Sequence, residues 1–455
     1  MENKKYAFSR LLYVIEAALE YFVSIAVGTV YLAKITASIG MKDSLTGVLT
    51  AFVSLGCGFQ IIALFIAHKK PVKRWVTVSH IISQSLFALL YFIPLLEISR
   101  GGKIALLILS LFLAQIIHNA ISAPKINWYM SLVDDDKRGR FTANKEIVSL
   151  LSGMIFTYAL GHIMDTYATK TAFITCGIMI FVLMGLHTLT LVFAQEKQEE
   201  RAERTDVKKS IKEELLKNKS ITKVIMLFVI WNIASATTIS FTGAYQHGTL
   251  GFTTTFSSVV IIIASIARAI FSRPLGRYAD KNSFCKMLYI CFVLEMIAFI
   301  INIFTVPSNG KGMYILFYTI YAIGQAGINS SIINLAYDYV SNEHKTGAVA
   351  LVNTFSGFAG FFTALLMSPL VDYIQANDNM VFGMKIYSQQ LMSAISAIVV
   401  IFILIYLKVV ISKLPSKHKE EKLITLENRE KLSQGRVELT GIRTEKKRTY
   451  ILNKK

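Results

Sequence analysis

Long apolar runs alternate with short polar gaps along most of the chain. An α-helix rises about 1.5 Å per residue, so about 20 apolar residues can cross the hydrocarbon core of a bilayer. The pattern predicts about twelve membrane-spanning helices, and therefore an all-α membrane protein. The predicted spans are residues 10–34, 43–67, 75–97, 104–123, 146–166 and 172–194, followed by 223–247, 252–273, 285–306, 312–334, 347–374 and 388–412.

Basic residues gather in every second gap, and this bias predicts the orientation of the chain. The second gap reads "HKKPVKR", the fourth "DDDKRGR", the sixth "EKQEERAERTDVKK" and the eighth "SRPLGRYADK". The gaps between them are poor in lysine and arginine. Because basic residues flank membrane spans mainly on the cytoplasmic side, we expect these gaps and both termini in the cytoplasm. The expected location is the cytoplasmic membrane of a bacterium.

The sixth gap divides the spans into two groups of six. We therefore predict an N-terminal six-helix bundle (1–194), a cytoplasmic linker with some helix (195–222), a C-terminal six-helix bundle (223–412) and a basic, disordered cytoplasmic tail (413–455). The stretches "INWYMSLVDDDKRGRFTAN" and "INLAYDYVSNEHKTGAVALVN" follow the fourth span of each group and share the order of their polar residues. This correspondence indicates a duplicated architecture.

Composition and charge exclude several classes of function. Of 455 residues, 53% are hydrophobic and 17% charged, whereas a soluble domain carries about 25% charged residues. The net charge of +19 comes from basic gaps and not from a basic helix face, so we expect no nucleic-acid partner. The four cysteines have no zinc-site spacing, and no catalytic or nucleotide-binding motif occurs. We expect neither an enzyme nor a metal or cofactor site.

Two glutamates, Glu16 and Glu20, lie inside the first apolar run. A carboxylate near the middle of a membrane costs a few kcal/mol, so ionisable residues there usually face a cavity or a partner. The two side chains are one helical turn apart and repel each other when both are ionised, which favours binding of a proton. Glu16 lies nearer the cytoplasmic end and could instead pair with Arg10. Glu20 is deeper, and a function is favoured for it.

Other polar residues cluster on single faces of the fourth, seventh and tenth spans. Together with the two glutamates they form the predicted pathway for solute and protons: Gln115, His118, Asn119, Asn232, Gln246, Gln325 and Asn329. A packed, hydrogen-bonded histidine is the alternative interpretation of His118. Small residues recur every fourth position in the fifth span, from Gly153 to Gly161, and in the eleventh, from Ser356 to Ala364. That spacing favours close helix packing.

The eighth gap contains "GRYADK", from Gly276 to Lys281. It resembles the G-x-x-x-D-[RK] loop motif of the major facilitator superfamily of transporters. The resemblance implies two pseudo-symmetric six-helix bundles, with spans one, four, seven and ten lining a central cavity. It also implies a conformational gate, in which Asp280 would lie within reach of Arg138 and Arg140 at the start of the fifth span. The second gap, "AHKKPVKRW", lacks the aspartate of the motif.

The combined interpretation is a secondary active transporter that moves a small solute by alternating access. Proton coupling through Glu16 and Glu20 is the favoured energy source, although another coupling ion would fit the same pattern. The expected partners are the solute, protons and membrane lipids, and we expect a monomer. A polar organic solute and a cationic amphiphile fit the candidate residues equally well. The alternative is a membrane sensor or lipid-handling protein that shares the fold without transporting.

Overall fold

The computed structural model describes residues 6–62, 72–133, 138–197, 218–337, 339, 345–381 and 383–414. Contacts between residues divide the chain into two units, Met1–Ile411 and Ser412–Lys455. Of the second unit, only residues 412–414 are described. The predicted linker and tail thus fall largely outside the described residues. Residues 134–137, 338 and 340–344, which belong to the two duplicated stretches, also lie outside them.

The helices before residue 198 form the first helix group. They are α2 (Ala7–Ala26), α3 (Thr29–Ser38), α4 (Asp43–Thr50), α5 (Phe52–Gly58), α7 (Val72–Phe92), the short η1 (Ile93–Leu95), α8 (Arg100–Met130), α9 (Arg138–Thr166) and α10 (Thr169–Phe193). The first predicted span is therefore a bent pair, with 43° between α2 and α3. Gly28 occupies the break, where a Cβ would lie 2.9 Å from the Ile25 carbonyl oxygen.

The helices after residue 217 form the second helix group. They are α12 (Lys219–Ile239), α13 (Thr242–Ala244), the π-helical turn η4 (Tyr245–Thr249), α14 (Thr254–Lys281), α15 (Phe284–Ile303), α16 (Gly310–Tyr337), α17 (Lys345–Ala376), α18 (Ser388–Val409) and η6 (Ile411–Lys413). An antiparallel hairpin of β1 (Met380–Val381) and β2 (Met384–Lys385) separates α17 from α18. Asn218, Thr253 and Ser283 accept backbone hydrogen bonds at the starts of α12, α14 and α15, which satisfies amides that a helix leaves unpaired.

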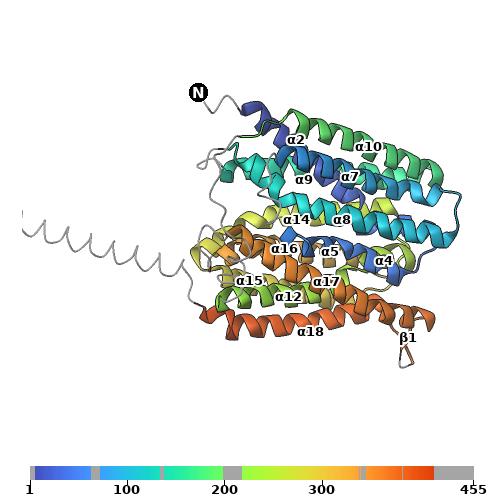
Figure 1. The fold of residues 1–455 in the computed structure, drawn as a ribbon. Coiled ribbons are helices and arrows are strands. Elements are labelled where there is room, and N and C mark those ends of the chain that lie inside the picture. Colours follow the sequence, from blue (N-terminus) through green and yellow to red (C-terminus); the bar gives the residue numbers. More distant parts are fainter. Residues whose placement is uncertain are drawn as a thin grey trace, which may run out of the picture. The chain divides into compact units, whose positions relative to one another are not determined.

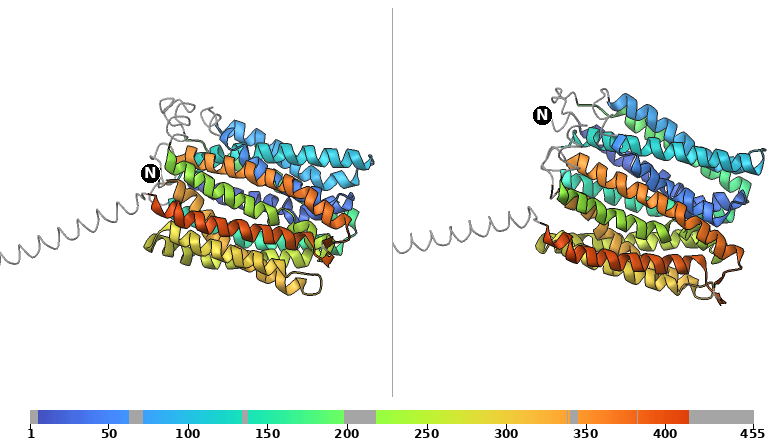
Figure 2. Two further views of the ribbon diagram at one scale, coloured as in Figure 1. Left: turned by 90° about the horizontal axis from the view of Figure 1, so that it is seen from below. Right: turned by 60° about the horizontal axis from the view of Figure 1, so that its bottom comes forward.

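The prediction of an all-α membrane protein is confirmed. In the described part of the chain, nine helices are long and apolar enough to cross a bilayer, and the bent pair would raise the number to ten. The shorter apolar helical segment Asp43–Gly58 and the 28-residue α16 occupy the second and tenth predicted spans. Each of the twelve predicted runs thus contains helix. In both views of Figure 2 the long helices lie side by side with their axes roughly parallel.

The prediction that "GRYADK" forms a loop is wrong. Helix α14 continues through these residues and ends at Lys281. Similarly, α8 does not stop at residue 123 but passes Pro124 and ends at Met130. An internal proline removes only one helical N–H donor, and a helix that leaves the bilayer can continue in water with polar side chains. The apolar runs marked the membrane crossings, whereas the helices are longer than the crossings.

The two ends of the helices are distinguished by the β1–β2 hairpin. We call the end that carries it the hairpin side and the other end the opposite side; α2 begins at the opposite side, at the left of Figure 1. At the opposite side Arg10 donates to the Leu132 carbonyl and Tyr406 to the Lys223 carbonyl. At the hairpin side Arg100 donates to the Gly40 carbonyl. Successive helices thus alternate in direction, as the charge bias of the gaps predicts.

Small residues let the two helix groups approach each other, as the spacing predicts. Helix α9 packs against α14, and α17 packs against α4 and α5. A Cβ on Gly161 would lie 2.2 Å from the Ser258 hydroxyl, and one on Gly360 would lie 3.2 Å from the Ser54 hydroxyl. A Cβ at Gly161 would force a neighbour to shift, and one at Gly360 would be tightly packed, so the two stripes lie at close helix contacts as the spacing predicts.

Candidate functional site

A buried cluster of charged side chains lies between α2 and α8. The Lys125 ammonium is 2.7 Å from a Glu16 carboxylate oxygen and 2.5 Å from a Glu20 carboxylate oxygen. Helix α2 places the two glutamates one turn apart on one face. Helix α8 reaches them because it continues past Pro124, so that Lys125 remains within the helix. One cation is therefore shared by two carboxylates inside the protein.

Only one of the two glutamates is accessible. The Glu16 side chain is 1% exposed, the Lys125 side chain 2% and the Glu20 side chain 25%. Charges this deeply buried require partners, because each loses several kcal/mol of hydration. The ion pairs offset that loss for Glu16 and Lys125. Glu20 completes the cluster and also faces a cavity.

Three histidines extend the cluster. His187 on α10 has Nε2 2.9 Å from a Glu16 carboxylate oxygen, and His80 on α7 lies with its ring 3.8 Å from the ring of His187. Both histidines are fully buried. His118 on α8 is 3.7 Å from Glu20. The cluster therefore links four helices of the first helix group, and its buried end is at Glu16.

The open end of the cluster meets a cavity of about 440 Å³. The first helix group contributes Glu20, His118, Lys145 and Glu146 to its lining, and the second contributes Arg268 from α14. The Lys145 ammonium also lies 4.9 Å from the centre of the Tyr13 ring. Charged side chains of both signs, contributed by both helix groups, thus line one cavity. The lining residues on α8, α9 and α14 lie in the halves of these helices nearer the opposite side.

The other predicted pathway residues do not line this cavity. Gln115 and Asn119 are buried against α5, where Gln60 donates to Asn119. Gln325 donates to the buried Glu295 on α15, and Gln246 lies 3.5 Å from the Tyr318 hydroxyl. Asn232 lines a separate cavity of about 230 Å³, and Asn329 is half-buried on α16. The structure therefore brings together Glu16, Glu20 and His118 and leaves the predicted amides away from this cavity.

The predicted gate residues lie at the opposite side. Gly276 and Asp280 are on the last turns of α14, and Lys281 ends that helix. Helix α9 begins at Arg138. The side chains of Arg138 and Arg140 lie outside the described residues, so the contact with Asp280 stays a prediction.

Sequence reasoning missed Lys125, His80 and His187. The predicted fourth span ended at residue 123, so Lys125 was assigned to a polar gap. The two histidines lie within the third and sixth apolar runs, where ionisable residues are uncommon. That rarity alone was a signal that could have selected them. Their contacts could not be predicted, because the residues that meet, Glu16, His80, Lys125 and His187, are far apart in the sequence.

The two helix groups are joined at the hairpin side by buried hydrogen bonds. The Tyr31 hydroxyl bonds to the Thr157 carbonyl and to the Ser258 hydroxyl, both at 2.8 Å. Asp165, at the end of α9, accepts hydrogen bonds from the amides of Thr254 and Thr255 at the start of α14. A carboxylate at a helix N-terminus is also favoured by the helix dipole.

A second set of contacts joins α4 to α17 at the same side. Asp372 accepts hydrogen bonds from Ser44 at 2.6 Å and from Lys42 at 3.3 Å. Asp43 accepts a hydrogen bond of 2.9 Å from Gln375. These polar contacts, together with those of Tyr31 and Asp165, close the space between the helix groups at the hairpin side.

Substitution of Gly243 by alanine is expected to shift the protein toward a conformation that is open at the hairpin side. A Cβ at Gly243 would lie 2.3 Å from the Thr29 carbonyl oxygen, so α13 and α3 could not remain in contact. Reaction of a cysteine introduced at Thr46, which lines the cavity behind this contact, should become several-fold faster in the Gly243→Ala variant. Gly312→Ala is the control, because a Cβ there would meet no atom within 4 Å. Equal reaction rates in both variants would contradict the steric argument.

Solved structures of low sequence identity share the fold. The nucleoside transporter NupG matches with a TM-score of 0.67 and 13% identity, over 90% of this chain and 100% of that chain. A POT family peptide transporter matches with a TM-score of 0.66 and 10% identity, over 90% and 98%. The xylose transporter XylE from E. coli matches with a TM-score of 0.63 and 12% identity, over 86% and 94%. At these identities the likeness concerns the fold alone.

Comparison of the sequence itself gives the family. No curated protein matches the sequence. Residues 13–364, however, match the model of the Major Facilitator Superfamily, and this segment runs from within α2 into α17 and includes the charged cluster. The resemblance seen in the sequence is confirmed: this membrane protein belongs to the major facilitator superfamily of transporters.

Proposed function

We propose that the protein is a secondary active transporter that couples a small charged solute to protons by alternating access. The observation that supports this proposal is the Glu16–Glu20–Lys125 cluster, which meets a cavity lined by both helix groups. The hairpin side is closed by direct contacts between the groups. A cavity at one side and a closure at the other are what one end state of alternating access requires.

The cluster provides a place where one proton can bind. Two carboxylates and one ammonium carry one excess negative charge, and a proton on Glu20 leaves a neutral Glu16–Lys125 pair. Glu20 is the member that a proton can reach, because it alone of the three lines the cavity. Close carboxylates titrate as a coupled unit, so the proton belongs to the cluster even if Glu20 is the point of entry.

The charges around the cavity favour a solute that carries both signs. Lys145 and Arg268 can bind an anionic group, and Glu20 and Glu146 can bind a cationic one. Arg268 comes from the second helix group, whereas the other three come from the first. A zwitterionic solute that bridges them would hold both groups together. A cationic amphiphile fits less well, because most of the described residues that line this cavity are polar or charged.

Orientation and domain organisation belong to the same proposal. The described helix ends that flank the basic gaps lie at the opposite side, so we place that side in the cytoplasm and the hairpin side outside the cell. The structure then corresponds to a cytoplasm-facing state. The bundles 1–194 and 223–412 would move relative to each other, joined by the linker 195–222. Contact of Asp280 with Arg138 or Arg140 would stabilise the state that is open at the hairpin side.

Solute-dependent proton movement in proteoliposomes tests the proposal. The purified protein would be reconstituted with a pH-sensitive dye inside, and amino acids, dipeptides, nucleosides, sugars and cationic amphiphiles would be added in turn. We expect a zwitterionic compound to change the internal pH and to accumulate only while a pH gradient exists. If no compound on the panel moves protons or exchanges, the alternative of a sensor or lipid-handling protein on this fold is favoured.

A further inference from the structure

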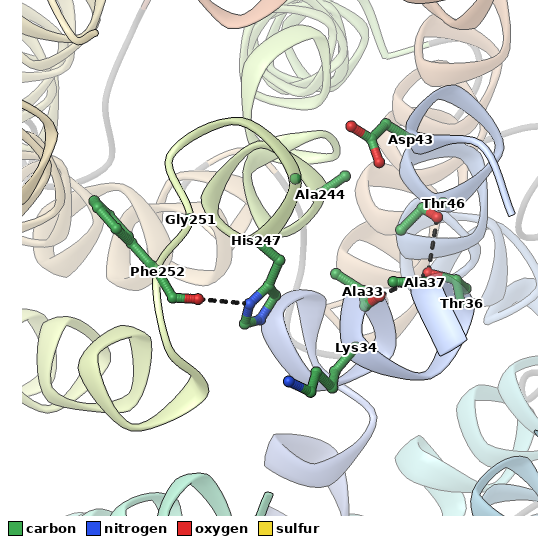
Figure 3. A pocket seen from close by; sticks show the side chains of 11 residues that line it. Ala33, Lys34, Thr36, Ala37, Asp43, Thr46, Ala244, His247, Gly251 and Phe252 are labelled. Carbon is green, nitrogen blue, oxygen red and sulfur yellow. Dashed lines mark hydrogen bonds between the residues drawn. The ribbon is translucent and has the colours of Figure 1, made fainter. Parts of the chain in front are cut away.

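A second cavity, of about 280 Å³, lies at the hairpin side between α3, α4 and η4. Figure 3 shows the His247 side chain pointing into it from η4, with Lys34 and Asp43 on the facing elements. The lining residues Gly248 and Gly251 are exposed, so solvent protons reach this cavity from the hairpin side. Single π-helical turns occur frequently at functional sites.

Both ring nitrogens of His247 face carbonyl oxygens. Nδ1 lies 3.0 Å from the Phe252 carbonyl oxygen, and Nε2 lies 3.2 Å from the Val30 carbonyl oxygen. A carbonyl oxygen can only accept a hydrogen bond, so each contact requires an N–H on the ring. Neutral imidazole has one N–H and imidazolium has two. Only the protonated ring can therefore make both hydrogen bonds.

The two carbonyls belong to different helix groups. Phe252 precedes α14 in the second group, whereas Val30 is on α3 in the first. A neutral ring that keeps its bond to Phe252 would place a nitrogen lone pair against the Val30 oxygen. Protonation replaces that repulsion with a charge-assisted hydrogen bond across the closed contact. The contact between the two helix groups at the hairpin side is therefore stronger when His247 is protonated than when it is neutral.

Charged groups of both signs face this imidazole. Lys34 on α3 is the cationic group and Asp165 at the end of α9 is an anionic one. Asp43 on α4 lines the same cavity. The two carboxylates have other partners, since Asp165 accepts from Thr254 and Thr255 and Asp43 accepts from Gln375. Neither carboxylate forms an ion pair with His247 within the described residues, so the two carbonyls remain its direct partners.

We propose that His247 is a proton-binding site that locks the hairpin side closed when it is protonated. This inference rests on the proposed function, because it assumes that the hairpin side opens and closes. A proton can shift a conformational equilibrium only if it binds the two states differently, and the Val30 carbonyl exists as a partner only in the closed state. Protons at the hairpin side would thereby favour the state in which the cavity at Glu20 opens toward the opposite side.

Distances between spin labels at the hairpin side test the proposal without any solute. Labels would be attached to cysteines at the exposed Glu97 and Ser308 after replacement of Cys57, Cys176, Cys285 and Cys291. The background also carries Glu20→Gln, which removes the proton site at the other cavity. We expect the ratio of closed to open molecules to fall by about tenfold as the pH is raised from about 4 to about 8, because one charge-assisted hydrogen bond across the contact is lost.

His247→Gln in this background should make the ratio independent of pH in that range. The matched control is His162→Gln. His162 is an exposed histidine near the same end of α9, and its ring forms a hydrogen bond with the Thr166 hydroxyl. This control should retain the full tenfold change. A pH-independent ratio in the His247-containing protein, or an undiminished change in His247→Gln, would overturn the proposal. Neither result depends on transport, so failure here is distinct from failure of the flux experiment.

Discussion

Replacement of Glu20 by glutamine is expected to abolish proton-driven accumulation of the solute while exchange across a symmetric membrane continues. Glutamine keeps the shape of the side chain but cannot bind or release a proton. Lys125 remains paired with Glu16, and this remaining buried pair is neutral, so the protein should fold and insert normally. In proteoliposomes with an imposed pH gradient, accumulation should fall to the level of empty vesicles, whereas exchange of labelled for unlabelled solute should persist.

The control for this experiment is Glu295→Gln. Glu295 is also a fully buried carboxyl, but it accepts a hydrogen bond from Gln325 on α16 and does not line the cavity of Glu20. We expect this variant to keep its coupling. Undiminished pH-driven uptake by Glu20→Gln would show that Glu20 is not needed for coupling. Loss of exchange as well would indicate that Glu20 binds the cationic end of the solute.

Lys125→Met should produce the largest loss of stability. Removal of the ammonium leaves Glu16 and Glu20 without the cation that they share, in a site where Glu16 is 1% exposed. Breaking a buried ion pair from one side typically costs about 3–5 kcal/mol. We therefore expect a clearly lower Tm in detergent at neutral pH. Acidification should recover part of the loss, because protonated carboxyls no longer require a cation.

Two further variants separate the charge effect from a simple loss of packing. Lys145→Met changes a lysine that lines the same cavity but contacts Tyr13 instead of a carboxylate, so we expect a loss below about 1 kcal/mol. The double variant Lys125→Met/Glu16→Gln removes the cation together with the more buried carboxylate and should recover much of the stability. If Lys125→Met and Lys145→Met unfold alike, the shared ion pair does not stabilise the fold.

Much of the fold could be predicted from the sequence, because a bilayer imposes a simple length requirement on apolar segments. Each predicted run contains helix, and the alternation of basic gaps agrees with the alternating helix directions. The ends of the helices were less predictable. Hydropathy reports where the bilayer ends, whereas helices such as α8 and α14 continue beyond it with polar residues and an internal proline. The interpretation of "GRYADK" as a loop failed for this reason.

The candidate site was only partly predictable. Glu16 and Glu20 were selected because ionisable residues are costly in apolar runs, and that argument needs no tertiary contact. The amides of the fourth and tenth spans were selected by the same periodicity, but Asn119 instead accepts a hydrogen bond from Gln60, and Gln325 donates one to Glu295 on α15. A polar stripe on a helix shows that a partner exists. It does not distinguish a cavity from a neighbouring helix.

The sequence by itself determined that this is a helical membrane protein with two carboxylates in its first apolar run. Only the tertiary structure decided which carboxylate is accessible and which cation both of them share. It also decided that His247 lies between two carbonyls of different helix groups. The physical reason is that helix formation and membrane insertion depend on neighbouring residues, whereas an ion pair depends on distance in space. Lys125 is more than one hundred residues from Glu16 in the chain and 2.7 Å from it in the fold.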